Sequence, residues 1–144
     1  MKKLLILAIA ILMFGNLSAK PKVFSVQNVA IGGVDVVAYF TIGQPTMGLN
    51  NYTTEWQGAI WQFSSPENLA MFNKDPTRFA PQFGGFCSLT TAHGASIPIN
   101  PMAWTIHNER LYLFVFETAR DTWLMNPDKL IKRANLAWST ELSK

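Results

Sequence analysis

Few residues of this 144-residue chain could carry chemistry, and the first is its single cysteine, Cys87. It comes two residues after the Gly84-Gly85 pair, where the backbone can approach a ligand closely, and a thiolate there could bind a soft metal ion or react. A lone cysteine can equally be a small buried core residue, because burial protects the thiol from oxidation. One cysteine excludes an intrachain disulfide and a zinc site built from several thiolates.

His93 and Asp35 are further candidates. His93 follows Cys87 by six residues, which is about 240° around a straight helix, so the two converge only if the helix ends before Gly94. A histidine near a helix end can instead interact with the helix dipole. Asp35 is the one charge in an apolar run, so it must bind a backbone amide or an arginine, or face a cavity.

Tyr39 follows Asp35 by four residues and shares its face if this run is a strand. Asp35, Tyr39, Cys87 and His93 are therefore the candidate ligand-binding residues. Cys87, Asp35 and His93 are the candidate ligands for copper or another soft metal ion. Tryptophans could also line an apolar pocket, although packing in the core is their usual role; the chain contains Trp56, Trp61, Trp104, Trp123 and Trp138.

Short elements must position these residues. The apolar run 34–40, bounded by glycines, predicts a buried strand. Residues 52–63 predict a hairpin that turns at Gln57-Gly58, and the segment 64–67 (SSPE) predicts the start of a helix. Residues 86–93 predict a short helix that ends at Gly94.

The last third of the chain shows the same mixture of elements. Residues 104–116 predict a second hairpin with a turn at 107–109, and helices are expected from Asp121 and over 127–138. We therefore predict a single small α+β domain, in which short antiparallel hairpins pack with several short helices. The domain covers residues 29–138, after an exit segment at 20–28 and before a C-terminal tail at 139–144.

The first nineteen residues are typical of a signal peptide. Two lysines precede an apolar run at 4–14, and small residues lead to Ala19. As a helix this run spans only about 16 Å, whereas the hydrocarbon core of a bilayer is about 30 Å thick. Residues 1–19 therefore predict export, to the periplasm or beyond the cell, with no stable membrane span once the signal is removed.

Charge argues against a polyanionic partner. Without Lys2 and Lys3, 10 of the 12 Lys and Arg residues remain against 9 Asp and Glu, which gives a net charge of +1. No run of basic residues remains in the chain after residue 19, so nucleic acid is not an expected partner. A protein partner cannot be predicted from the sequence.

Several short segments, in order, are similar to the YHS domain family, specifically its exported single-domain branch. They include GVDVVAYF at 33–40, WQGA at 56–59, WQFSSPENL at 61–69, FGGFC at 83–87 and RLYL at 110–113. The resemblance covers roughly residues 29–125 and implies a metal-associated fold, because related domains carry a Cys-x-x-x-Cys pair. Ser64 and Asn68 stand where those cysteines would fall. The resemblance therefore implies the family's fold and its Cys87 segment for this chain, but not the thiolate metal site.

Three hypotheses follow. The first is an exported, soluble YHS-like domain that binds a metal ion or a small ligand near Cys87. The second is a single-cysteine thiol enzyme or redox protein, although the chain lacks a C-x-x-C motif. The third is a structural or partner-binding domain without pocket chemistry.

Overall fold

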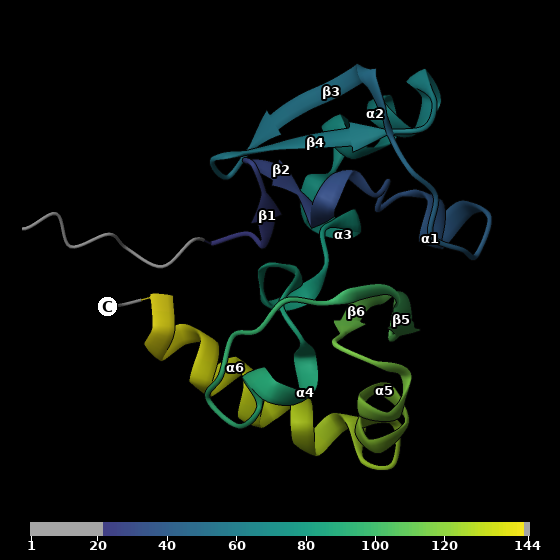
Figure 1. The fold of residues 1–144 in the computed structure, drawn as a ribbon. Coiled ribbons are helices and arrows are strands. Elements are labelled where there is room, and N and C mark those ends of the chain that lie inside the picture. Colours follow the sequence, from purple (N-terminus) through teal and green to yellow (C-terminus); the bar gives the residue numbers. More distant parts are fainter. Residues whose placement is uncertain (1–21, 143–144) are drawn as a thin grey trace, which may run out of the picture.

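The computed structural model describes residues 22–142, which form two lobes with the hairpin β5–β6 at their junction (Figure 1). The N-terminal lobe, residues 22–80, holds β1 (Ser25–Val26), β2 (Val29–Ala30), η1 (Ile31–Gly33), α1 (Ala38–Thr41), β3 (Leu49–Trp56), β4 (Ala59–Phe63), α2 (Pro66–Lys74) and α3 (Pro76–Phe79). The C-terminal lobe, residues 81–142, holds η2 (Gln82–Gly85), α4 (Ser88–Thr91), β5 (Asn100–His107), β6 (Arg110–Phe114), α5 (Glu117–Leu124) and α6 (Pro127–Leu142). The predicted α+β class with short antiparallel hairpins is confirmed.

Local turn chemistry produces both hairpins. In the first, Gln57 and Gly58 take φ values of 50° and 75° between β3 and β4, the left-handed pair that a tight two-residue hairpin turn requires. In the second, Asn108 and Glu109 take φ values of 48° and 59° between β5 and β6. The N-terminal lobe extends the first hairpin to a sheet in the order β1-β2-β4-β3, in which β2 runs parallel to β4.

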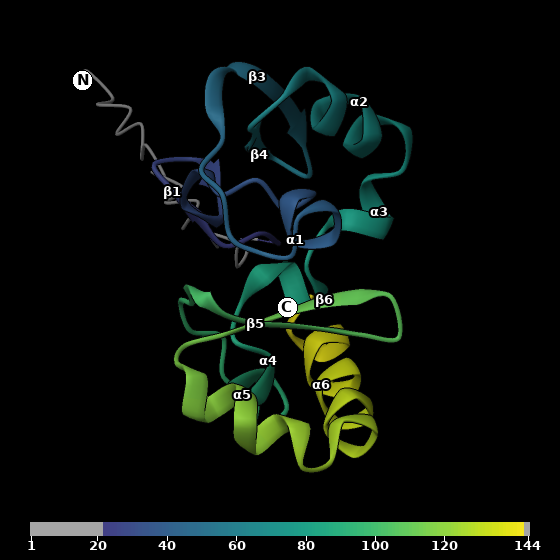
Figure 2. The ribbon, with the colours of Figure 1, turned by 90° about the vertical axis from the view of Figure 1, so that its right-hand side faces the viewer.

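Strand β6 contributes side chains to two hydrophobic cores, because successive side chains of a strand point to opposite faces. Leu111 and Leu113 belong to the first core, which the N-terminal lobe supplies. Tyr112 and Phe114 belong to the second core, which lies against α4, α5 and α6. Figure 2 shows the β5–β6 hairpin crossing the middle of the molecule, between the N-terminal lobe and these helices.

Side-chain caps begin two of the helices in the N-terminal lobe. The Ser65 hydroxyl accepts a hydrogen bond from the Asn68 N–H at 3.1 Å, and Pro66 occupies the first turn of α2. Asp75 ends α2 and caps α3 through the Arg78 N–H. The predicted helix start at 64–67 is thus confirmed, with Ser65 as its cap.

Residues 34–40 form a turn and helix α1, so the prediction of a strand there is wrong. Val36 and Val37 are fully buried, as expected. The Asp35 carboxylate accepts the N–H groups of Val37 at 2.9 Å and Ala38 at 3.2 Å, and such capping stabilises a helical turn. An apolar run buried on all sides has no period that separates a helix from a strand. Asp35 and Tyr39 therefore do not share the face of a strand.

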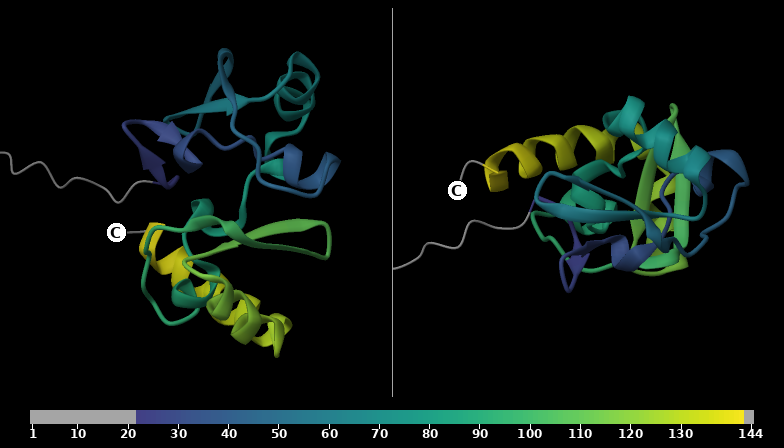
Figure 3. Two further views of the ribbon diagram at one scale, coloured as in Figure 1. Left: turned by 45° about the vertical axis from the view of Figure 1, so that its right-hand side comes forward. Right: turned by 90° about the horizontal axis from the view of Figure 1, so that it is seen from above.

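The folded part of the chain extends beyond both predicted ends of the domain. The predicted signal peptide, residues 1–19, lies outside the described residues. Part of the predicted exit segment folds as β1, and α6 continues through residue 142 into the predicted tail. Within residues 22–142, no helix combines the length and apolar character needed to cross a membrane. Figure 3 shows α6 running along the outside of the C-terminal lobe.

Candidate functional site: the interlobe pocket

Asp35 is fully buried, and its carboxylate is saturated with hydrogen bonds. Besides the two backbone bonds that begin the α1 turn, it accepts the Ser64 N–H at 2.8 Å, the Ser64 hydroxyl at 2.6 Å and the Asn68 side-chain amide at 2.8 Å. Five donors leave its two oxygens little capacity for a further partner. The Asp35 cluster, which we define as Asp35, Ser64 and Asn68, ties the α1 turn to the start of α2.

Ser64 and Asn68 are the positions at which the family resemblance would place a pair of metal-binding thiols. Here both side chains donate to the same oxygen of Asp35, Oδ2. The cluster is therefore a closed network of neutral donors around one carboxylate. Sequence reasoning did not pair these residues, although a buried carboxylate and two polar residues at a helix start are the signal that could have done so.

Tyr39 joins the two lobes. Its hydroxyl donates to the Pro101 carbonyl at 2.8 Å, and its ring lies 5.0 Å from that of Trp104, centroid to centroid. Burial raises the pKa of Tyr39 because the charged phenolate would lose its hydration. The side chain thus acts as a neutral donor that attaches α1 to β5.

Cys87 lies in the second core and is 0% exposed. Its backbone begins α4: the carbonyl accepts bonds from the Thr91 N–H and from the hydroxyls of Thr90 and Thr91. A reaction of the thiol with a substrate would require this core to open. The geometry therefore favours the core interpretation of Cys87 over that of a reactive thiol.

The glycines that precede Cys87 allow close packing within the protein. A Cβ at Gly84 would collide with the Lys22 carbonyl, and one at Gly85 would collide with the Ile31 side chain. The Gly84 carbonyl also accepts the Phe24 N–H at 2.8 Å. The close approach that suggested a ligand is thus made by the N-terminal lobe itself.

His93 lies on the surface after α4, where its Nδ1 is 3.4 Å from a guanidinium nitrogen of Arg133. Asp35, Cys87 and His93 consequently do not form the metal site that the sequence suggested. No group of three or more His, Cys, Asp or Glu side chains that could hold a metal ion occurs within residues 22–142. The four candidate residues are divided between a saturated cluster, a lobe contact, a core and the surface.

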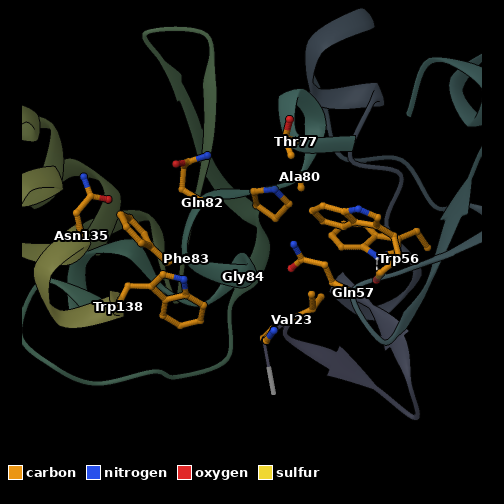
Figure 4. A pocket seen from close by; sticks show the side chains of 13 residues that line it. Val23, Trp56, Gln57, Thr77, Ala80, Gln82, Phe83, Gly84, Asn135 and Trp138 are labelled. Carbon is orange, nitrogen blue, oxygen red and sulfur yellow. Dashed lines mark hydrogen bonds between the residues drawn. The ribbon is translucent and has the colours of Figure 1, made fainter. Parts of the chain in front are cut away.

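A pocket of about 400 Å³ lies between the lobes, and we call it the interlobe pocket. Figure 4 shows Trp56 on one side of it and Trp138, from α6, on the other. Both lobes supply its lining, which comprises Lys22, Val23, Trp56, Gln57, Trp61, Thr77, Ala80, Pro81, Gln82, Phe83, Gly84, Asn135 and Trp138. Its volume lies within the range of small-molecule sites, and its lining contains both aromatic and polar residues.

Ring contacts fix the aromatic walls. On the N-terminal side the Trp61 indole N–H donates to the Trp56 carbonyl at 3.0 Å, and their rings meet edge to face at 5.6 Å. On the C-terminal side Trp138 packs edge to face on Phe83 at 6.4 Å. Phe83 holds a left-handed conformation, with φ 56° and ψ 40°. Such a conformation costs a non-glycine residue about 1–2 kcal/mol, and strain of this kind is concentrated at functional sites.

Three carboxamides of the lining make no hydrogen bond to another residue that the structure describes. Within residues 22–142 the side chains of Gln57, Gln82 and Asn135 make no hydrogen bond. They come from the β3–β4 turn, from η2 and from α6; Figure 4 shows Gln57 on the side of Trp56, and Gln82 and Asn135 on the side of Phe83 and Trp138. Each carries a free donor and a free acceptor, so the lining can hydrogen-bond a ligand from several directions.

Sequence reasoning found only part of this site. It considered tryptophans as pocket lining, and the structure divides them. Trp123 is buried in the second core, Trp61 is buried in the first core and also lines the pocket, and Trp56 and Trp138 are half-buried at the pocket. The three carboxamides were missed. In the sequence, the feature that could have indicated them is that each carboxamide lies close to an aromatic residue of the lining. Gln57 follows Trp56, and Gln82 precedes Phe83. Asn135 lies three residues before Trp138 on one helix.

Comparison of the chain with models of protein families, with curated proteins and with solved structures found no match.

Proposed function

We propose that the protein is an exported binding domain of the YHS type and that its ligand is a small molecule held in the interlobe pocket. The observation that carries the proposal is the pocket: about 400 Å³ between aromatic walls from both lobes, lined by three carboxamides that have no hydrogen-bond partner among residues 22–142. Apolar walls with a few free polar groups are the usual composition of a ligand site.

The family part of the proposal is supported by where the matched segments lie. The segments 33–40 and 61–69 meet at the Asp35 cluster, through the bonds from Ser64 and Asn68. The segments 56–59 and 83–87 both contribute to the lining of the interlobe pocket. Export is supported by residues 1–19, whose charged start, apolar run and small residues before Ala19 are typical of a signal peptide.

The proposal places the ligand in the pocket and away from Cys87. Cys87 has no exposed surface, and the carboxylate of Asp35 already accepts five hydrogen bonds. The pocket lining, by contrast, has partly exposed indole rings and three amides that make no hydrogen bond within residues 22–142. The geometry thus favours recognition of an organic molecule over binding of a metal ion at the residues that the sequence singled out.

Ligand-observed NMR tests the proposal. The purified protein is mixed in turn with maltose, cellobiose, adenosine, choline and 2-naphthol, and saturation transfer to each compound is recorded. We expect transfer to at least one of them, and we expect Trp138→Ala to abolish it, because Trp138 forms one wall of the pocket.

Leu136→Ala is the matched control for Trp138→Ala. Leu136 lies on the same helix, is 72% exposed and is not part of the pocket lining, so its truncation should leave the transfer unchanged. The proposal is wrong if no compound shows transfer, or if the transfer persists in Trp138→Ala.

A further inference from the structure

The lining of the interlobe pocket is almost free of charge. Lys22 is its only charged residue, and among the described residues no carboxylate lines it. An anionic ligand such as a phosphate ester would meet one cation, which is few compared with the clusters that hold such groups. A cationic ligand would meet the lysine and no opposite charge. The lining therefore favours an uncharged ligand.

The carboxamides indicate a ligand with hydrogen-bonding groups around its perimeter. Gln57, Gln82 and Asn135 line the cavity from three separate elements, Gln57 on the N-terminal side and the other two on the C-terminal side (Figure 4). Each amide both donates and accepts, and so does each hydroxyl group. A polyhydroxylated ring can therefore pair with all three, whereas a flat heterocycle presents its polar groups in one plane.

The aromatic walls fit the faces of such a ring. Trp56 and Trp138 line the cavity from opposite lobes. An indole face is electron-rich and attracts weakly positive C–H groups, which a pyranose ring presents on its faces. Apolar ring faces and a polar perimeter are found together in sugars, and the pocket presents the complementary surfaces.

We propose that the ligand of the interlobe pocket is a neutral saccharide of one or two pyranose rings. Its faces stack on Trp56 and Trp138, and its hydroxyls bind the carboxamides of Gln57, Gln82 and Asn135. This inference rests on the proposed function, since it names the class of ligand for the same pocket. It differs from the metal and thiol chemistry that the sequence suggested, because neither Cys87 nor the Asp35 cluster takes part.

Isothermal titration calorimetry tests the saccharide class. The purified protein is titrated with maltose, cellobiose, lactose and N,N′-diacetylchitobiose, and separately with adenosine and with choline. We expect at least one saccharide to bind with a Kd of about 1 mM or tighter. We expect Trp138→Ala to remove that binding, and Gln57→Ala to weaken it about tenfold, because one hydrogen bond is lost.

Two variants keep the test independent of folding. Gln57 is exposed in a turn, so Gln57→Ala leaves the cores intact, and its effect on Kd reports on the pocket alone. Asn73→Ala removes a carboxamide from the exposed side of α2, outside the pocket lining, and should leave Kd unchanged.

The outcomes distinguish failure of the saccharide inference alone from failure of the proposed function. Binding of adenosine or choline alone, lost in Trp138→Ala, would overturn the saccharide inference and leave the pocket as a ligand site. Saccharide binding that survives both Trp138→Ala and Gln57→Ala would place the sugar elsewhere and overturn the inference. If no probe of any class binds, the saccharide inference and the proposed function both fail.

Discussion

Two groups of polar side chains in this protein differ in where their hydrogen-bond partners come from. In the Asp35 cluster a buried carboxylate accepts five hydrogen bonds, and every donor belongs to the protein. In the interlobe pocket three carboxamides make none within residues 22–142. Polar groups with internal partners hold the fold, whereas free polar groups beside aromatic rings in a cavity are available to a ligand. Four predictions test this division.

The largest effect is expected at Asp35. Asp35→Asn keeps the volume but turns an amide NH₂ toward donors that need an acceptor, so we expect a loss of about 3–4 kcal/mol in the free energy of unfolding. Urea denaturation measures it. Asp121→Asn is the control, because Asp121 is exposed and, among the described residues, its side chain binds only its neighbour Arg120. A loss at Asp35 below about 1 kcal/mol would contradict a structural role for the cluster.

A glycine pair tests how the lobes meet beside the pocket. Gly84 and Gly43 have similar φ values of 63° and 68°, but only Gly84 has protein atoms close to where a Cβ would be. We expect Gly43→Ala to cost about 1 kcal/mol from backbone strain and Gly84→Ala to cost about 3 kcal/mol, because the Lys22 backbone must also move. Equal losses of stability in the two variants would show that the contact is easily displaced.

Tyr39 tests the attachment of α1 to β5 and is expected to have a smaller effect. Tyr39→Phe removes the bond to Pro101 and should cost about 1 kcal/mol at pH 7. Burial raises the pKa of Tyr39 in the folded state, so the unfolded chain loses this proton first. Its contribution is present below pH of about 10, the ordinary tyrosine value, and is lost as the pH rises above it.

Urea denaturation at pH 7 and pH 11 measures this dependence. The wild-type protein should lose more stability between the two values than Tyr39→Phe does, because only the wild type has the shifted phenol at this position. Equal losses in the two proteins would contradict the assigned role of Tyr39.

The smallest effect on stability is expected at the pocket amides. Gln57→Ala removes no hydrogen bond within the described protein, so the free energy of unfolding should change by less than about 0.5 kcal/mol. Thermal denaturation measures the change. A loss above about 1 kcal/mol would mean that Gln57 supports the fold, and the contrast with Asp35 would disappear.

The parts of the fold that local signals determine could be predicted from the sequence. The turn at Gln57-Gly58 and the start of α2 at Ser65 depend on residues within a few positions of each other. The segment 34–40 could not be predicted in this way. Its conformation depends on the Asp35 carboxylate, which is shared with Ser64 and Asn68, 29 and 33 residues away.

The candidate site could be predicted even less well. Cys87 and Asp35 were singled out because their residue types are chemically capable, but burial and internal bonds occupy both of them. The pocket joins segments from Lys22 to Trp138, and its lining contains no residue type that is chemically unusual. Aromatic rings and amides are common residue types, and they form a binding site only when the folded chain brings them together.

We propose that the interlobe pocket binds the ligand, while the Asp35 cluster and Cys87 stabilise the fold. The ¹H–¹⁵N spectrum tests it most directly, because the five tryptophan indoles give separate signals from the pocket and from elsewhere. With maltose, cellobiose, adenosine or choline added, we predict shifts of the Trp56 and Trp138 signals, while that of Trp123, which belongs to the same core as Cys87, stays in place. Shifts of Trp123 without Trp56 and Trp138, or no shift with any of these compounds, would contradict the claim.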